Sequence, residues 1–450
     1  MDDPRNSVHP VYGAAINRRR LLGGAIAVAG GLAVSTPTGS VFAAGRPSRV
    51  RLILPAPTGP NDIGTVSLHL IDHARQDPFL PAPHPRELMV SVWYPARKAG
   101  RRLAPWMPAA ALAYYRQELE TVLGSPPGPS PDVPPPPPPA VMTSEVSLDG
   151  VDFPITHAAE GAPVDRSAGP YPVVFFSPGA DQNREQGTTL VEELASHGYV
   201  VVTISHTYQA GEVEFPGGRV ERGRPQQAPY VALSIRIADT RFVIDSLATL
   251  KASQNPDAEH SPLPGGLGAC MDMARIGMFG HSLGGATTAQ IMAQDPRVRA
   301  GVNLDGSFFP DDIPLESSPE EIDRALKLLA SRIGDRPFMI MASGGFGPDY
   351  FGDLTSTVWH HLRGWRRFIS LIDTTHFSYT DDEPLLSQLA KAGIIPTAAP
   401  WIGETDPERT VAAERAYIRA FFDLWLRNRE THLLDGPSAQ YPEARFYPPA

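Results

Sequence analysis

The stretch that decides the fold is Arg275-Ile-Gly-Met-Phe-Gly-His-Ser-Leu-Gly-Gly-Ala286. Its apolar first half predicts a buried strand, and the small residues at its end predict the start of a helix. Between the two, Gly280 and Gly284 stand two residues on either side of Ser282. Glycines at these positions let the chain turn sharply and keep the serine hydroxyl clear of neighbouring Cβ atoms. We therefore interpret the stretch as a G-x-S-x-G nucleophile elbow rather than an ordinary glycine turn.

The elbow predicts a reactive serine with partners elsewhere in the chain. A serine hydroxyl is a poor nucleophile until a base takes its proton, so a histidine and an orienting acid are needed. In sheets that carry this turn the partners follow in the order Ser, then Asp or Glu, then His. The turn also directs the backbone N–H of Leu283, at the helix N-terminus, towards any oxyanion formed on Ser282.

Composition argues against several classes of protein. The 450 residues are 42% hydrophobic, enough for a large core, and the net charge of −10 argues against nucleic acid as a partner. A single cysteine, Cys270, rules out an internal disulfide and a cysteine-rich metal site. We interpret it as a small residue before a strand rather than a catalytic thiol. No H-E-x-x-H, P-loop or dinucleotide G-x-G-x-x-G follows a strand in the required place, so we expect no metal and no cofactor.

The N-terminus has the pattern of an export signal. Asn17-Arg-Arg-Arg-Leu-Leu22 precedes the mildly apolar run Gly23–Val34, and Val41-Phe-Ala43 has the form of a cleavage site. Paired arginines before a weakly apolar run are typical of a twin-arginine signal, with a Sec signal or a retained anchor as alternatives. The run is too short for a membrane span, which needs about 20 apolar residues. We predict a signal peptide over residues 1–43 and a secreted, extracellular or periplasmic protein.

The rest of the chain alternates predicted strands and helices, which indicates an α/β fold with a mainly parallel central sheet flanked by helices. We expect one domain over residues 44–450. The predicted strands are Arg86–Pro95, Tyr171–Ser177, Gly198–Ser205, Arg275–Phe279, Arg299–Leu304, Phe338–Met341 and Arg367–Ile372. The predicted helices are Ala109–Val122, Gly187–His197, Tyr230–Leu250, Ala286–Gln294, Ser318–Ile333 and Thr410–Arg427, and Ser318, Pro319 and Glu321 form a capping box at the start of one of them.

Less regular segments interrupt this alternation. Ten of the fifteen residues in Ser125–Pro139 are proline, which predicts a polyproline-like surface loop, either a spacer or the edge of a lid. A strand is expected at Glu145–Leu148, with Phe153–His157 as its hairpin partner. We expect insertions at residues 96–145, 207–228 and 306–330 to roof the active site. Apolar side chains in these insertions either line an acyl site or pack in the core: Trp106, Met107, Tyr114, Tyr115, Phe308 and Phe309.

His376 is the predicted base. It lies just beyond the strand Arg367–Ile372, and active sites of such sheets assemble at the carboxyl ends of parallel strands. The other histidines after the elbow are interpreted as surface or packing residues. They are His360, His361 and His432.

The acid has more than one candidate. Asp305 ends the first strand after the elbow helix and is followed by a glycine, which favours it. Asp349 and Asp353 follow the next strand, in a glycine-rich loop where capping a helix is the simpler explanation.

A second oxyanion donor is expected in the loop after an earlier strand. In Phe175-Phe-Ser-Pro-Gly-Ala180, Gly179 permits close approach of the backbone. The N–H of Ala180 is the favoured donor, and Asp181 is the alternative.

Three motifs resemble the secreted platelet-activating-factor acetylhydrolase (isoform II) family and the bacterial lipases and esterases grouped with it. They are Val92-Trp-Tyr-Pro95, the run Val173–Tyr208 with Ser-Pro-Gly-Ala and Leu-Ala-Ser-His-Gly-Tyr-Val-Val, and Gly280-His-Ser-Leu-Gly-Gly-Ala-Thr287. The resemblance spans residues 86–435 and implies the α/β-hydrolase fold.

The resemblance also bears on the site. The family's acid follows its nucleophile by 23 residues, and here 305 − 282 = 23, so it implies Asp305 as the acid. It places the oxyanion donor at Ala180. Pro178 stands where the family often has His, and Ala180 is smaller than the family's usual residue. Both departures leave the N–H in place but change the shape of the acyl pocket.

These patterns predict a secreted serine carboxylic-ester hydrolase that uses Ser282, His376 and Asp305 and forms an acyl-enzyme. The expected substrate is a lipid-like or short-chain acyl ester, with no nucleic-acid partner. One alternative is a cutinase-like or polyester hydrolase, although such enzymes lack long insertions. The other is a secreted binding protein that keeps the fold without catalysis.

Overall fold

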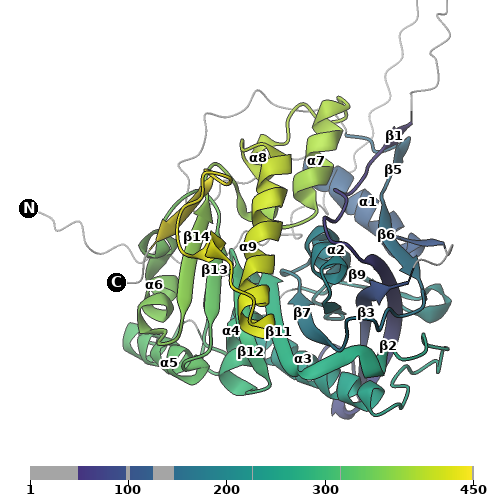
Figure 1. Cartoon of the computed structure of the whole chain (residues 1–450), viewed down its shortest axis with the longest axis horizontal. Coiled ribbons are helices and arrows are strands. Elements are labelled where there is room, and N and C mark those ends of the chain that lie inside the picture. The colour runs from purple at the N-terminus through teal and green to yellow at the C-terminus, as the bar shows by residue number, and fades with distance from the viewer. Residues whose placement is uncertain (1–48, 98–101, 125–145, 226, 315, 448–450) are drawn as a thin grey trace, which may run out of the picture.

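The structure, a computed structural model, is built around one large sheet with helices on both faces (Figure 1). It describes residues 49–97, 102–124, 146–225, 227–314 and 316–447. The predicted signal peptide and the proline-rich segment 125–139 lie outside the described residues.

The sheet has 11 strands in the order β15-β14-β13-β12-β11-β7-β8-β3-β2-β6-β4. Neighbours from β8 through β7, β11, β12 and β13 to β14 are parallel, whereas β3 is antiparallel to both β8 and β2. The strands in sheet order are Ala444–Tyr447, Arg366–Leu371, Phe338–Ala342, Val298–Leu304, Met271–His281, Tyr171–Ser177, Val200–Ser205, Pro85–Ala96, Asp62–Gln76, Ile155–Glu160 and Leu103–Pro105.

Helices cover both faces of this sheet. One hydrophobic cluster joins the strands to α3, α4, α5 and α6, and a second joins their opposite face to α2 and α9. The helices are α1 Ala109–Leu123, α2 Thr188–Ser196, α3 Pro229–Lys251, α4 Leu283–Gln294, α5 Pro319–Ile333, α6 Gly352–His361, α7 Asp382–Lys391, α8 Ala399–Ile402 and α9 Pro407–Arg427.

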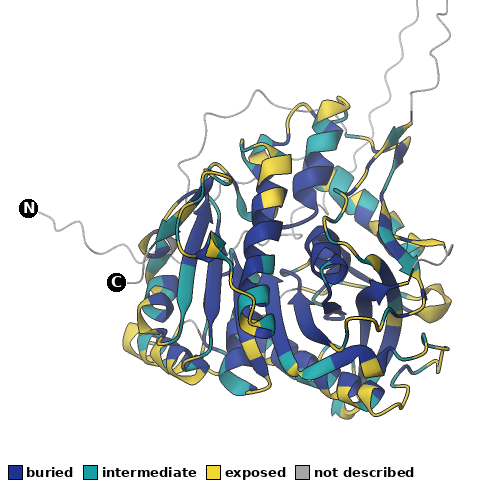
Figure 2. Cartoon of the chain, viewed as in Figure 1, coloured by how far each residue is buried: buried dark blue, intermediate teal, exposed yellow. Residues whose placement is uncertain are grey.

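The central strands are buried on both faces, as a continuous apolar run predicts for a parallel sheet. Every residue of β7 and of β8 is buried, and Figure 2 shows these strands as a dark layer between the helices. The predicted fold class is confirmed. The capping box at Ser318 is also present, with its hydroxyl accepting from the N–H of Glu321.

Two expectations for the periphery are wrong, and one strand was not predicted. Residues 146–148 form no strand, and the strand β6 pairs instead with β2 and β4. The 15-residue strand β2 lies outside the predicted set. Residues 319–330 do not roof the active site, because α5 packs against α4 and α6 on the flank of the sheet. The partners of β6 lie far away in the chain, so local patterns do not reveal its pairing. The strand β2, in contrast, pairs along its length with the next strand, β3.

Most of the apolar residues in the insertions pack in a core. Trp106, Met107 and Tyr115 belong to a third hydrophobic cluster with α7 and α8, and the Trp106 indole N–H donates to Asp381 Oδ2 at 2.8 Å. Phe308 is fully buried in the first cluster, whereas Tyr114 is 38% exposed. Trp106, Met107, Tyr115 and Phe308 are therefore structural.

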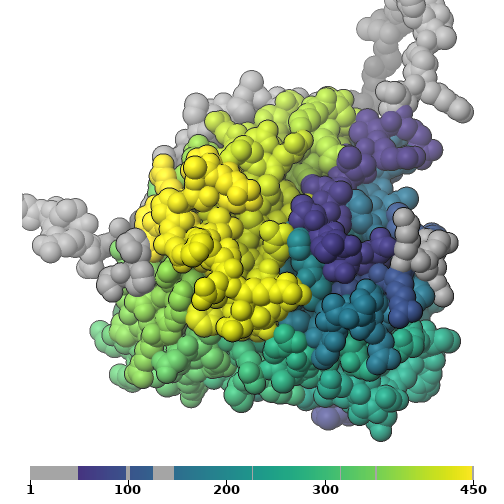
Figure 3. All heavy atoms as spheres, in the orientation of Figure 1, coloured from purple at the N-terminus to yellow at the C-terminus, as the bar shows by residue number. Residues whose placement is uncertain are grey.

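The beginning and the end of the described chain are joined. Residues 55–58 run beside α9, so the purple and yellow parts of the surface adjoin in Figure 3. Arg415 of α9 donates to the carbonyl oxygens of Pro55 and Ala56, both at 2.8 Å. Both segments also bond α2, since Arg415 donates to the Thr189 carbonyl and the Thr58 hydroxyl donates to Glu193.

Candidate active site

Ser282 lies at a sharp turn between β11 and α4. Its backbone has φ 54° and ψ −121°, a conformation that non-glycine residues adopt only where the surrounding structure holds them. The Ser282 N–H donates to the Leu304 carbonyl at 2.8 Å, and the Ser282 carbonyl accepts from the N–H groups of Gly285 and Ala286. These bonds tie the turn to the neighbouring strand β12 and to its own helix.

The elbow glycines are needed because backbones meet here. A Cβ on Gly280 would lie 2.3 Å from the Gly284 carbonyl oxygen, and one on Gly284 would lie 1.9 Å from the Ser177 carbonyl oxygen. Gly306 approaches Ser282 equally closely, since its Cβ would lie 2.3 Å from the Ser282 carbonyl oxygen. The start of α4 is therefore packed directly on the end of β7.

Asp305 is held rigidly beside this turn. Its backbone has φ 52°, and its N–H donates to the Met341 carbonyl at 2.7 Å. Its carboxylate accepts from the Ser343 N–H at 2.8 Å, the Ser343 hydroxyl at 3.1 Å and His376 Nδ1 at 2.7 Å. Burial alone would raise the pKa of Asp305, but the bonds to His376 and Ser343 outweigh burial and lower it. The group is therefore a carboxylate at neutral pH.

The alternative acids lie elsewhere. Asp349 is 78% exposed in its side chain and binds the Ser356 hydroxyl at 2.7 Å and His360 Nε2 at 3.2 Å. Asp353 lies in the first turn of α6. Neither carboxylate bonds His376.

His376 opens a short 3-10 helix, His376–Tyr379, just after β14. Because Nδ1 is engaged by Asp305, Nε2 is the ring nitrogen left to take a proton. The side chain is 42% exposed, so the ring is accessible from solvent. Its centroid lies 4.5 Å from that of His281, the neighbour of Ser282. The fold thus brings Ser282, Asp305 and His376 to one corner of the sheet.

His281 and Gln182 support this corner and were not predicted. His281 Nε2 lies 2.8 Å from the His376 carbonyl oxygen, and its Nδ1 lies 2.7 Å from Gln182 Oε1. Burial and, second, the charge of His376 lower the pKa of His281 to about 3, so it stays neutral. The sequence signal was the position of His281 directly before Ser282, but its partners come from distant parts of the chain.

The two predicted oxyanion donors come from the loop after β7 and from the start of α4, two segments that pack against each other at Gly284. Ala180 follows β7, and Leu283 is the first residue of α4. In the described part of the chain no acceptor bonds the N–H of either residue. The Asp181 N–H, in contrast, donates to the Gln209 carbonyl at 3.0 Å, so Asp181 does not serve as the donor.

Other potential sites lie apart from this corner. A cavity of about 360 Å³ is lined by Asp77, Glu87, Thr207, Tyr208 and others, none of them a predicted site residue. Burial raises the pKa of the Cys270 thiol to about 12, so it is not a nucleophile. Within the described ranges we find no group of three or more His, Cys, Asp or Glu that could hold a metal ion, and no helix long and apolar enough to cross a membrane.

Comparisons with known proteins place the chain among esterases. Residues 266–321 match the family model for platelet-activating factor acetylhydrolase, isoform II. The chain is 24% identical to a probable 1-alkyl-2-acetylglycerophosphocholine esterase of Arthroderma benhamiae, covering 88% of this chain and 93% of the relative. It is 25% identical to the platelet-activating factor acetylhydrolase of Cavia porcellus, over 31% of this chain and 36% of that protein.

A solved structure agrees with these relatives. The ferulic acid esterase of Streptomyces cinnamoneus superposes with a TM-score of 0.65 and 31% identity, covering 88% of this chain and 99% of that one. Fold and relatives together define an α/β-hydrolase that hydrolyses carboxylic esters. The chain belongs to the esterases related to platelet-activating-factor acetylhydrolase isoform II, which confirms the resemblance seen in its sequence.

Gly284→Ala tests the contact between β7 and α4. Alanine favours a helix over glycine by about 1 kcal/mol, but its methyl group would overlap the Ser177 carbonyl. We expect a net loss of about 2 kcal/mol in the free energy of unfolding, measured from the denaturant midpoint. Gly265→Ala is the control, since its Cβ meets nothing within 4 Å. Equal midpoints for both variants would show that the contact is not tight.

Proposed function

We propose that this protein is a secreted serine ester hydrolase in which Ser282 is the nucleophile, His376 the base and Asp305 the orienting acid. The observation that carries the proposal is the 2.7 Å bond between His376 Nδ1 and an ionised, buried Asp305 beside the strained elbow. A carboxylate in this position holds the imidazole in one tautomer and stabilises its protonated form.

The reaction follows from these positions. His376 Nε2 takes the hydroxyl proton while Ser282 Oγ attacks the ester carbonyl carbon. The carbonyl oxygen becomes an oxyanion, which the N–H groups of Ala180 and Leu283 bind. As the intermediate collapses, the protonated His376 gives its proton to the departing alcohol and an acyl-enzyme remains. Water, deprotonated by His376, then attacks the acyl carbon, and the carboxylic acid leaves with Ser282 restored.

Asp305→Asn tests the proposed triad. The amide keeps the shape but favours the wrong imidazole tautomer, so kcat on p-nitrophenyl acetate should fall about 10⁴-fold. Asp349→Asn is a matched control, because it alters another Asp–His pair at an exposed position, and kcat should stay within about twofold. A fluorophosphonate should label wild-type Ser282 and leave Ser282→Ala unlabelled. A folded wild-type protein that resists the probe would overturn the proposal.

We propose a short acyl chain for the substrate. The buried aromatic side chains of the insertions are used in the core and are not available to line a long acyl channel. The names of the relatives point the same way, since that of the Arthroderma benhamiae protein specifies an acetyl ester. The solved neighbour, a ferulic acid esterase, suggests an aromatic acyl group instead, and the 40% exposed Phe377 beside His376 is a surface that such a group could contact.

A panel of esters separates these possibilities. We expect kcat/KM to be highest for p-nitrophenyl acetate or butyrate and to fall at least about tenfold for the octanoate. A feruloyl ester and a suspended polyester complete the panel. A maximum at the feruloyl ester would favour the aromatic acyl group, and release from the polyester would favour the cutinase-like alternative.

We also propose export through the twin-arginine route, which carries folded proteins. The support is the arrangement Arg18-Arg19 before the weakly apolar run Gly23–Val34. Changing Arg18 and Arg19 together to Lys should leave the unprocessed protein inside an expressing bacterial cell, as judged by size and fractionation. Unchanged export of this variant would favour the Sec route.

A further inference from the structure

We define the oxyanion loop as residues 178–180. A second hydrogen-bonded Ser-His-Asp line, made of Ser177, His206 and Asp239, lies directly behind this loop. The Ser177 hydroxyl lies 3.0 Å from His206 Nε2, and His206 Nδ1 lies 3.0 Å from Asp239 Oδ2. Ser177 ends β7, His206 follows β8, and Asp239 lies in α3. The proposed catalytic triad uses none of these residues.

This line is sealed and is not a second nucleophilic site. The side chains of Ser177, His206 and Asp239 are fully buried, so no substrate reaches them. Burial and, second, the charge of Arg236 lower the pKa of His206 to about 4, which keeps the ring neutral. Its one N–H therefore points to Asp239, and its Nε2 accepts from the Ser177 hydroxyl.

Arg236 connects this line to the oxyanion loop. Its Nη1 donates to the Ser177 hydroxyl at 3.3 Å and also to the Pro178 carbonyl. Its Nη2 donates to the Gly179 carbonyl at 2.9 Å, and its Nε donates to Gln209 Oε1 at 2.9 Å. The guanidinium is fully buried, and each of these four bonds goes to the oxyanion loop or to a group beside it.

The bond to Gly179 bears on the oxyanion donor through the geometry of one peptide unit. The Gly179 carbonyl and the Ala180 N–H belong to the same planar trans peptide, so they point in opposite directions. A group that holds the carbonyl on the buried side therefore aims the N–H to the other side. The Gly179 N–H is held too, by Gln182 Oε1 at 2.8 Å. A cation on the carbonyl also strengthens the N–H as a donor.

From this geometry we infer that Arg236 is a positioning residue for the oxyanion hole, kept in place by Ser177, His206 and Asp239. The inference rests on the proposed function, because it assumes that Ala180 donates to an oxyanion on the substrate. Arg236 acts through the backbone and does not touch the substrate.

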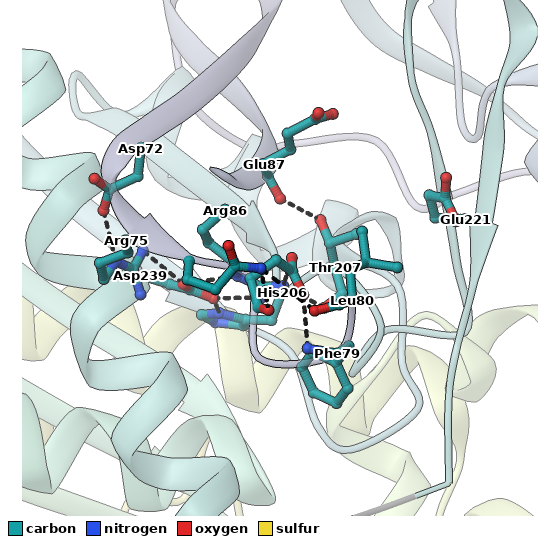
Figure 4. Close-up of polar contacts among 12 residues, drawn as sticks. Asp72, Arg75, Phe79, Leu80, Arg86, Glu87, His206, Thr207, Glu221 and Asp239 are labelled. Atoms are coloured by element: carbon teal, nitrogen blue, oxygen red, sulfur yellow. Dashed lines mark hydrogen bonds and ion pairs between the residues drawn. The ribbon is translucent and has the colours of Figure 1, made fainter. Parts of the chain in front are cut away.

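The far end of the line is anchored by further charges (Figure 4). Arg86 donates to both oxygens of Asp239 at 3.1 and 2.8 Å, and Arg75 donates to Oδ1 at 2.9 Å. Arg86 also bonds Asp77 and the Thr207 carbonyl, which line the cavity described above. Asp239 therefore keeps two cationic partners when Arg236 is replaced by a neutral residue. Its buried carboxylate does not become unpaired.

Arg236→Met tests the inference, since Met fills much of the same space without donors. We expect kcat on p-nitrophenyl acetate to fall about 10²-fold with KM changed less than about threefold, because the lost interaction forms with the oxyanion. The inhibition constant of an arylboronic acid, which forms a tetrahedral anion on serine, should rise by the same factor as kcat/KM falls. Arg236→Lys should recover part of the loss.

Two further variants keep the test decisive. Arg241→Met is the control on the same helix, because Arg241 also donates to a backbone carbonyl, that of Gln294 at 2.8 Å, but not to the oxyanion loop. Its kcat should stay within about twofold. If Arg236→Met does not fold, Ser177→Ala removes only the hydroxyl between His206 and Arg236 and should lower kcat about fivefold.

The outcomes distinguish this inference from the proposed function. The positioning role alone would be overturned by two results together. The fluorophosphonate would label the wild-type protein, and Arg236→Met and Ser177→Ala would leave kcat and boronate inhibition unchanged. A rise in KM with unchanged kcat would also overturn it, because that pattern reports ground-state binding. Wild-type protein that resists the probe would instead overturn the proposed function.

Discussion

The corner of the sheet that holds Ser282, Asp305 and His376 depends on one backbone contact. In this contact the start of α4 packs against the end of β7. A side chain on Gly284 would reach the Ser177 carbonyl at 1.9 Å, so nothing larger than glycine lets the two elements meet. This approach places Leu283, which begins the helix, close to the loop that carries Ala180. The contact thereby joins two segments about 100 residues apart in the chain. The strained backbone of Ser282 is held by its bonds to Leu304, Gly285 and Ala286.

Two polar systems lie near this contact, one open to solvent and one buried. His376 and Asp305 lie on the accessible side, where a proton can move to and from a substrate. Arg236, His206 and Asp239 lie on the buried side, where no substrate can come. Buried charges are costly unless each one is paired and hydrogen-bonded, and a well-packed apolar cluster would serve stability as well. Holding the carbonyls of the oxyanion loop gives this buried network a function that apolar side chains cannot perform.

The parts predictable from sequence are those with a local signature. The central strands are continuous apolar runs, the capping box at Ser318 repeats a known spacing, and the elbow carries its glycines at fixed positions. The pairing of β6 was missed, because its partners β2 and β4 lie far away in the chain. The long strand β2 was also missed, although it pairs along its length with the next strand, β3. The role of Trp106 could not be predicted from the sequence either. An aromatic residue in an insertion has the same sequence pattern whether it lines a pocket or packs in a core, and Trp106 packs in a core.

The sequence alone determined the fold class and the family, because apolar runs, glycine spacing and chain order are properties of the linear chain. The sequence favoured Asp305 as the acid, but only tertiary structure decided that it reaches His376, since Asp305 and Asp349 each bond a histidine. Tertiary structure also decided the contacts from which we propose a role for Arg236, which lies in the middle of a long helix with no motif around it. Hydrogen bonds to backbone carbonyls leave no residue pattern, so only the folded chain reveals them.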